Sequence, residues 1–192
     1  MKSEHDPLSR LMDKDAIWEC ALRYTRGLDR LDESLVRSAY WEDAVTCHGP
    51  VNGSFDDFWA WWFPLQHDRE ACQHFALNHT VDFESPDTAN AETYFVAAIK
   101  EHAADSVELL SGRYVDRFEK RGGEWRIAIR VLVFDWQATG DASEMSRRLA
   151  HNHRGRRDTR DISYERPLRP RRETPTAPGP DHPAGAPADR QR

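Results

Sequence analysis

The segment from residue 125 to 136, WRIAIRVLVFDW, most constrains the fold, because its apolar residues alternate with a period of two. That period is typical of a β-strand whose side chains point alternately to its two faces. One face would be wholly apolar: Trp125, Ile127, Ile129, Val131 and Val133. The other would set four apolar residues around Arg130: Ala128, Leu132, Phe134 and Trp136.

Arg130 therefore needs a partner. An unpaired guanidinium among apolar side chains is costly in free energy. Two partners remain open at this point. One is a buried carboxylate, with which Arg130 would form a structural ion pair. The other is an anionic or oxyanionic ligand held in a cavity.

Composition separates a globular part of the chain from a C-terminal tail. Residues 154–192 hold seven of the eleven prolines and carry a net charge of +4, against −10 for the rest. This tail has almost no apolar surface to bury, so we expect it to be disordered. We place an N-terminal extension at 1–9, one domain at 10–150 and the disordered Pro/Arg-rich tail at 151–192. The domain is acidic and the tail lacks interleaved aromatics, which argues against a nucleic-acid partner.

Targeting and cysteine signals point to the reduced cytoplasm. The N-terminus has no apolar run of secretory length, and no stretch approaches the roughly 20 apolar residues of a membrane span. The three cysteines have no paired spacing, and the histidines share no metal-ligand spacing, so we expect no disulfide framework and no metal. No glycine-rich phosphate loop is present, and we expect no nucleotide or other cofactor.

Hydrophobic periodicity predicts helices in the first third of the chain and mostly strands after it. Ser54 with Asp57 three residues later is typical of a helix start. The predicted helices cover residues 11–31, 33–40 and 55–67. The predicted strands cover residues 44–48, 71–84, 90–102, 106–120 and 124–136.

Helices followed by a run of long antiparallel strands predict an α+β fold, with the helices packed on one face of a strongly curved sheet. Such a sheet leaves a cavity between itself and the helices. Polar residues in otherwise apolar framework would collect there. Four candidates stand out: Tyr24, Asp29, His74 and Arg130.

A succession of motifs over residues 10–137 resembles the SnoaL-like branch of the NTF2-like superfamily. The motifs are RYTRGLDRLD, YWEDAV, HGPVNG, QHFALNHTVDF, AETYF and GRYVDRFEKRGGEWRIAIR. Within this branch the chain is similar to the scytalone dehydratase, bile-acid dehydratase and hexachlorocyclohexane dehydrochlorinase families. The resemblance implies a cone-shaped α+β barrel and a homo-oligomer, either a trimer or a dimer.

The resemblance also implies a site. In those families an Asp on the first helix pairs with a His at the start of a strand, and the matching residues are Asp29 and His74. A Tyr of the dehydratases matches Tyr24, and an Arg of the last strand matches Arg130. The dehydrochlorinase has a Lys at the position of Tyr24, which favours the dehydratase side.

These residues suggest a reaction. A carboxylate beside one ring nitrogen makes the other nitrogen of a histidine a better base. We therefore predict a cofactor-independent lyase (dehydratase) or isomerase that acts on a small hydrophobic hydroxylated ring compound. His74 would remove a proton with Asp29 orienting it, while Arg130 and Tyr24 stabilise an oxyanion or the departing hydroxyl.

Residue chemistry alone leaves other roles open. Asp29 could be a solvated helix end paired with Arg26 or Arg30, and His74 a solvated strand residue. The protein could also be a non-enzymatic ligand-binding or assembly subunit, such as an oxygenase small subunit. That class does not need an Asp–His pair, so a hydrogen bond between Asp29 and His74 would discriminate. A tryptophan cluster could form core packing or an aromatic pocket: Trp59, Trp61 and Trp62.

Overall fold

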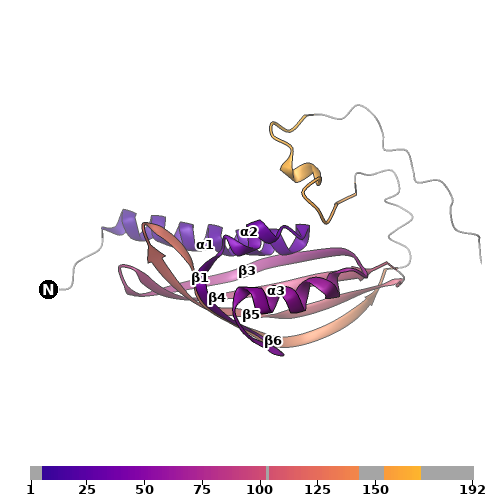
Figure 1. Ribbon diagram of the computed structural model, residues 1–192, viewed down its shortest axis with the longest axis horizontal. Helices are drawn as coiled ribbons and strands as arrows, with labels where there is room; N and C mark the ends of the chain where they lie inside the picture. Colours follow the sequence, from indigo (N-terminus) through magenta and orange to yellow (C-terminus); the bar gives the residue numbers. More distant parts are fainter. Residues whose placement is uncertain (1–5, 103, 143–153, 170–192) are drawn as a thin grey trace, which may run out of the picture.

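The computed structural model describes residues 6–102, 104–142 and 154–169. Its helices are α1 (Pro7–Arg30), α2 (Glu33–Arg37), α3 (Phe55–Trp62), η1 (Phe63–Gln66) and η2 (Ile162–Tyr164). Its strands are β1 (Tyr40–His48), β2 (Val51–Gly53), β3 (Arg69–Ser85), β4 (Thr88–Glu101), β5 (Ser106–Arg121) and β6 (Glu124–Asp141). Figure 1 shows α1 lying along the length of the sheet. None of the described helices is both long and apolar enough to cross a membrane.

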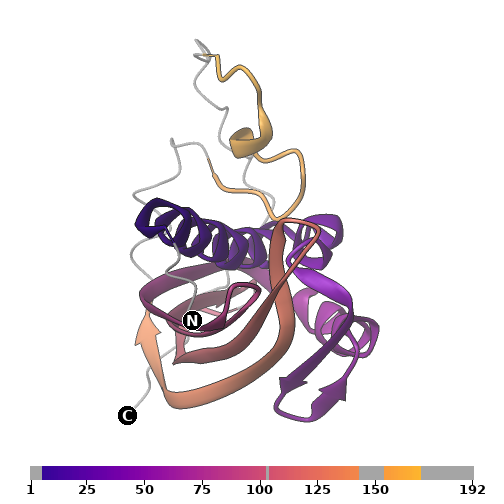
Figure 2. The same ribbon diagram turned by 90° about the vertical axis from the view of Figure 1, so that its left-hand side faces the viewer.

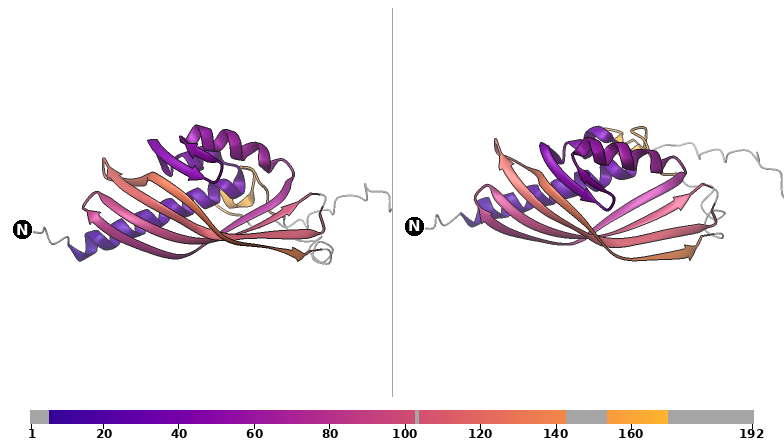
Figure 3. Two further views of the ribbon diagram at one scale, coloured as in Figure 1. Left: turned by 90° about the horizontal axis from the view of Figure 1, so that it is seen from below. Right: turned by 60° about the horizontal axis from the view of Figure 1, so that its bottom comes forward.

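All six strands belong to one sheet, in the order β2-β1-β6-β5-β4-β3. Every neighbouring pair is antiparallel except β1 and β6, which are parallel. The sheet curves beneath α1 and does not close (Figure 2). Figure 3 shows its strong twist and places α3 beside β1 and β2. The predicted α+β class, with N-terminal helices on a curved, mostly antiparallel sheet, is confirmed.

Several element boundaries differ from the predicted ones, most clearly around the third helix and the first strand. The predicted helix at 55–67 starts as expected, with Ser54 and Asp57 forming a capping box, but it turns into the tighter helix η1 after Trp62. Pro64 lies in the first turn of η1, where its missing N–H is tolerated. The short strand predicted at 44–48 begins earlier, and β2 was not predicted at all.

The face assignment within β6 was wrong at its start. Trp125 and Ile127 are buried together with Arg130, whereas Ile129 and Val131 are exposed. The cause is a register shift against β5, because Phe118 pairs with Ile127 while Arg117 pairs with Ile129. Ala128 is the extra residue. Such a bulge reverses the alternation beyond it, and no periodicity in β6 alone could reveal this.

The core fills the space between α1, α3 and the inner face of the sheet. Gly27 brings α2 close to α1, since a Cβ there would lie 2.5 Å from Val36 Cγ2. Trp59 and Trp62 pack against each other with ring centroids 5.3 Å apart, and Trp59 stacks on Phe55. This favours the core-packing role for these two tryptophans. Other large core residues are Ile17, Tyr24, Leu28, Phe58, Phe95, Phe118, Trp125 and Ile127.

The C-terminal region differs from the expected disorder over residues 154–169, which contact the domain. These contacts are hydrogen bonds and ion pairs made by arginine, aspartate and tyrosine side chains. The expectation counted only apolar surface, which such contacts do not need. Residues 170–192, and the predicted domain boundary at 150, lie outside the described residues.

Candidate functional site

The structure brings Asp29 and His74 together. Asp29 lies in the last turn of α1, and His74 lies near the start of β3. His74 Nδ1 and Asp29 Oδ1 are 2.7 Å apart. The backbone N–H of His74 also donates to both carboxylate oxygens, at 3.0 and 3.1 Å. One carboxylate therefore holds both the ring and the backbone of the histidine.

This pairing explains a carboxylate at an unfavourable position. The C-terminal end of a helix carries a partial negative charge, which disfavours another anion there. The contacts with His74 offset that effect for Asp29. Arg26 and Arg30, the alternative partners, contact residues 154–169 instead.

The charge state of His74 follows from these neighbours. Burial disfavours the imidazolium, but Cys72 and the Asp29 carboxylate outweigh burial and raise the pKa of His74 to about 10. The His74 side chain keeps 10% of its surface exposed and that of Asp29 keeps 15%. Because Nδ1 faces Asp29, Nε2 is the nitrogen left for proton exchange with a ligand.

Cys72 completes a compact group that the sequence analysis did not single out. Its Sγ lies 3.8 Å from His74 Nδ1, the same nitrogen that faces Asp29. A Cys–His–Asp triad needs the thiol and the carboxylate on opposite ring nitrogens, so these residues are not arranged as one. Their three donor atoms lie within 4.8 Å of one another and are where a metal ion could bind, but an ion would compete with the short Asp29–His74 hydrogen bond.

Arg130 lies in a different pair. Its Nε and Nη2 donate to the two oxygens of Asp116 at 2.7 and 2.6 Å, and both side chains are fully buried. Of the two partners left open by the sequence, the structure supplies a buried carboxylate. The rings of Tyr24 and Tyr114 lie 4.1 and 4.2 Å from the guanidinium carbon. Asp116 could have been found from the alternation of Tyr114, Asp116 and Phe118 in β5.

Tyr24, on α1, contacts His48 of strand β1. Its hydroxyl lies 3.1 Å from His48 Nε2, and His48 Nδ1 lies 2.6 Å from Thr46 Oγ1. Burial, aided by the charge of Arg130, lowers the pKa of His48 to about 3, so this ring is neutral. Burial raises the pKa of Tyr24 well above its usual value, which keeps its hydroxyl protonated. His48 was considered only as a metal ligand; the inward alternation of Ala44, Thr46 and His48 is the signal for its place here.

The four predicted site residues thus form two groups. Within the described parts of the chain, no hydrogen bond connects the Asp29–His74 pair with Tyr24 or Arg130. Arg130 Nη1 and the Tyr40 hydroxyl oxygen are among the buried polar atoms that have no hydrogen-bond partner within those same residues. Both atoms belong to the second group, and both are buried.

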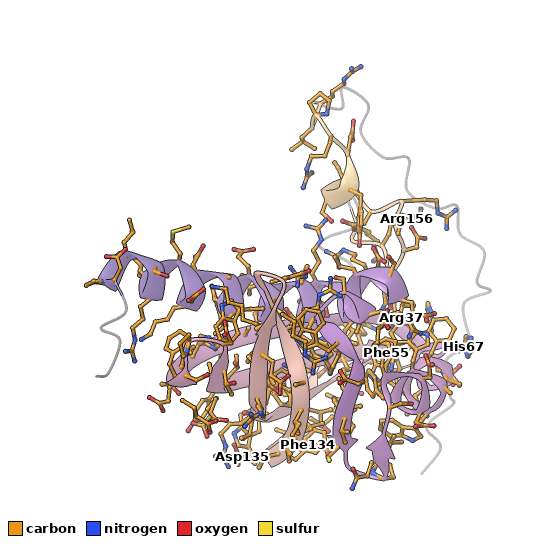
Figure 4. The ribbon with its side chains drawn as sticks, turned by 60° about the vertical axis from the view of Figure 1, so that its left-hand side comes forward. Arg37, Phe55, His67, Phe134, Asp135 and Arg156 are labelled. Atoms are coloured by element: carbon orange, nitrogen blue, oxygen red, sulfur yellow. The ribbon has the colours of Figure 1, made fainter. Side chains whose placement is uncertain are left out.

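An open hollow of about 820 Å³ lies elsewhere, between α2, α3 and β1. Arg37 and Phe55 meet there, with the guanidinium carbon 4.3 Å from the ring centroid (Figure 4). None of the four predicted site residues lines this hollow. Tyr40 does line it, whereas Asp29 and His74 do not, so the hollow is separate from the Asp29–His74 pair.

Comparisons with known proteins place the fold. Residues 9–131 match the model of the SnoaL-like domain. A candidate scytalone dehydratase from Novosphingobium aromaticivorans superposes with a TM-score of 0.63 at 20% identity, covering 68% of this chain and 89% of that one. A type 3 hexachlorocyclohexane dehydrochlorinase from Novosphingobium barchaimii superposes with a TM-score of 0.63 at 19% identity, covering 70% of this chain and 94% of that one. A candidate aromatic ring hydroxylase from Novosphingobium aromaticivorans superposes with a TM-score of 0.61 at 18% identity, covering 68% of this chain and 94% of that one.

At these identities the structural likeness establishes the fold and leaves the reaction open. Comparison with curated protein sequences gives no match. The family match, however, spans more than half of the chain and includes α1, the start of β3 and Arg130. The chain therefore belongs to the SnoaL-like domain family, and its fold is of the NTF2-like type.

Proposed function

We propose that this protein is a cofactor-independent dehydratase or isomerase of a small hydrophobic hydroxylated ring compound, with the Asp29–His74 pair as its proton-transfer unit. The observation that carries the proposal is the 2.7 Å contact between Asp29 Oδ1 and His74 Nδ1, in which the carboxylate occupies one ring nitrogen and not Nε2. Two neighbours in fold are named as a dehydratase and a dehydrochlorinase, which are both eliminating enzymes by name.

In the proposed dehydration, neutral His74 takes a proton from the carbon next to the hydroxyl-bearing carbon. The electrons of that C–H bond form the new double bond, and the hydroxyl leaves as water after receiving the same proton from the His74 imidazolium. Asp29 stabilises the imidazolium that forms. In an isomerisation, the same proton would return to a different carbon. The raised pKa of His74 means that its neutral, basic form increases as the pH rises toward about 10.

The second polar group would face the oxygen of the substrate. Arg130 Nε and Nη2 are occupied by Asp116, so we assign oxyanion stabilisation to Nη1 together with the Tyr40 hydroxyl. Tyr24 would support this arrangement through its ring, which lies against the Arg130 guanidinium. This narrows the predicted donor role of Arg130 to one nitrogen.

We also propose that the protein assembles as a homotrimer or dimer through the outer face of its sheet. That face exposes a number of large apolar side chains, and such surface is often covered by a partner. They include Phe75, Leu77, Tyr94, Val115, Ile129 and Val131. The cytoplasm as the compartment stays a prediction from the cysteine pattern.

A screen tests the proposed reaction. The wild-type protein is incubated with hydroxylated polyketides, steroids and terpenoids, and each mixture is followed by thermal shift and by mass spectrometry for loss of water or for an isomeric product. We expect at least one compound that both binds and is converted. Binding without conversion across all three classes would sink the enzymatic proposal.

The second candidate function is a non-enzymatic binding subunit. The Arg130–Asp116 pair favours it, because both side chains are fully buried and their charges are paired with each other without a ligand. Such a protein would bind a flat apolar molecule without converting it. His74→Ala would then leave its affinity for that molecule unchanged.

A further inference from the structure

Residues 154–169 lie at the junction of the two elements that carry the Asp29–His74 pair. Figure 1 shows this segment in yellow beside the end of α1 and beside α2. On the α1 side, Arg26 donates to the Ser163 carbonyl at 3.0 Å, and its guanidinium lies 4.7 Å from the Tyr164 ring. The Tyr164 hydroxyl donates to Asp32 at 2.8 Å.

A buried carboxylate organises the segment itself. Asp161 is 5% exposed and accepts hydrogen bonds from the backbone N–H groups of Arg156 and Ser163, at 2.8 and 2.9 Å. It also lies 3.4 Å from Arg30 Nε. Burial alone would raise the pKa of Asp161, but hydrogen bonds from Ser163 and Arg156 lower it to about 2. Asp161 therefore stays charged and ties the turn of the segment to α1.

On the β3 side the main contact is Arg157. Its Nη1 lies 3.3 Å from the carbonyl oxygens of both Gln66 and Arg69, and its Nη2 donates to Gln66 Oε1 at 2.9 Å. Gln66 is almost fully buried, at 3% exposure. Arg154 adds an exposed contact with Glu70 at 3.0 Å. The segment thus forms hydrogen bonds with η1 and with the start of β3, only a few residues before Cys72 and His74.

These contacts connect the end of α1 to the start of β3 through a third element. The short bond between Asp29 and His74 depends on how those two ends are placed, because a shift of about 1 Å is enough to lose a productive alignment. Charged hydrogen bonds such as those of Arg157 resist such a shift. We propose that Arg157 is a positioning residue, which holds β3 against α1 through residues 154–169 and so keeps Asp29 and His74 aligned. This inference rests on the proposed function of that pair.

A positioning role and a purely electrostatic role of Arg157 predict opposite changes in the pKa of His74 when the Arg157 side chain is removed. Loss of a nearby cation alone would favour protonation of His74 and raise its pKa. Loosening of the Asp29–His74 hydrogen bond would instead weaken one of the interactions that stabilise the imidazolium and lower the pKa toward 6.5. The direction of the change therefore separates a positioning role from a purely electrostatic one.

The test uses the full-length protein labelled with ¹⁵N-histidine and follows the titration of His74 by NMR. In Arg157→Ala we expect the pKa of His74 to fall from about 10 by at least about one unit. Arg157→Lys should recover part of that change, because lysine can still donate to Gln66. The matched control is Arg156→Ala, whose side chain is exposed, contacts only Asp158 among the described residues and points outward in Figure 4.

Tyr164→Phe removes the contact with Asp32 and serves as a second variant, with a smaller fall in the same direction. An unchanged or raised pKa of His74 in both Arg157→Ala and Tyr164→Phe overturns the positioning role. If a substrate is found, kcat of Arg157→Ala should also fall by roughly tenfold with the Arg156→Ala control near wild type. The NMR measurement needs no substrate, so it stands even if the proposed reaction fails.

Discussion

Two pairs of opposite charge lie on the inner side of this sheet, and they differ in how much of the cation each leaves free. In the Asp29–His74 pair, one ring nitrogen is bound, and the side chains keep 10 to 15% of their surface exposed. In the Arg130–Asp116 pair, two guanidinium nitrogens are bound and both side chains are fully buried. The first pair can gain and lose a proton, while the second holds fixed charges between neighbouring strands.

The difference follows from where each pair sits. Arg130 and Asp116 are register partners on adjacent strands, so the sheet itself sets their distance. Asp29 and His74 come from a helix end and a strand start, and a third segment bridges those two elements. Strand register fixes the distance within the Arg130–Asp116 pair, which suits a structural role. The Asp29–His74 pair lies where a helix end meets the start of a strand, which can suit a role in proton transfer.

The largest expected effect is on stability at the fully buried pair. Arg130→Met strands the Asp116 carboxylate, and Asp116→Asn leaves the Arg130 charge uncompensated, so each should lower the free energy of unfolding by about 3–5 kcal/mol. Urea unfolding measures this. The double variant Arg130→Met/Asp116→Leu should recover most of the loss, because two apolar side chains replace both charges. A stable Arg130→Met protein would contradict the structural role.

At the partly exposed pair, the main effect should be on turnover. His74→Ala removes the base, and Asp29→Asn removes its charged support, so each should lower the limiting kcat reached at high pH by at least about a hundredfold while the fold stays intact. Circular dichroism checks the fold, and the exposed His102→Ala is the matched control. Turnover close to wild type in His74→Ala would remove the proposed mechanism.

The same pair predicts a pH dependence of the rate. Because the pKa of His74 is raised to about 10, the neutral base is scarce near neutral pH. We expect kcat to rise by about tenfold per pH unit until it levels off near that pKa. In Asp29→Asn the plateau should begin at a lower pH, since one of the groups that favour the imidazolium is gone. A wild-type profile that is flat from about pH 6 to pH 9 would argue against His74 as the base.

Stability should also depend on pH through His74. Its pKa is about 10 in the folded protein and near 6.5 when unfolded. The stabilisation is therefore fully present below pH 6.5 and is lost as the pH rises toward 10. Unfolding free energies measured across that window should fall in the wild type. The slope should be shallower in Asp29→Asn, and equal slopes in the two proteins would contradict this account.

The smallest effect concerns the C-terminal region. A chain ending at residue 169 keeps the described contacts, so we expect its melting temperature and oligomeric state to match the full chain. A chain ending at residue 153 loses several partly exposed ion pairs and hydrogen bonds, together worth about 1–2 kcal/mol. That loss corresponds to a fall of roughly 2–8 °C, measured by calorimetry. A melting temperature unchanged on removal of residues 154–169 would mean that their contacts add no stability.

Much of the fold could be predicted because its signals are local. The helical spacing of α1, the Ser54–Asp57 capping box and the alternation in β4, β5 and β6 all depend on residues close in sequence. The bulge at Ala128 could not be predicted, because it exists only in the pairing of β6 with β5. Residues 154–169 escaped prediction for a similar reason, since their partners lie in α1, η1 and β3.

The site divides in the same way. Asp29 and His74 are 45 residues apart, and only the family resemblance pointed to their pairing. The need of Arg130 for a partner was clear from its apolar strand face, but two kinds of partner stayed open. No role was predicted for Cys72, His48 or Asp116. The role of a single cysteine, histidine or aspartate in a strand depends on its neighbours in space, which the sequence does not show.

The sequence by itself determined the class of fold, the order of its main helices and long strands, and the polar residues that would need partners inside it. These follow from periodicity, capping and the free-energy cost of isolated charge. Only the tertiary structure decided which partner each received, because strand register and helix placement bring distant residues within a few ångströms. Arg130 met a carboxylate that occupies two of its nitrogens, and His74 met one that occupies Nδ1 and not Nε2.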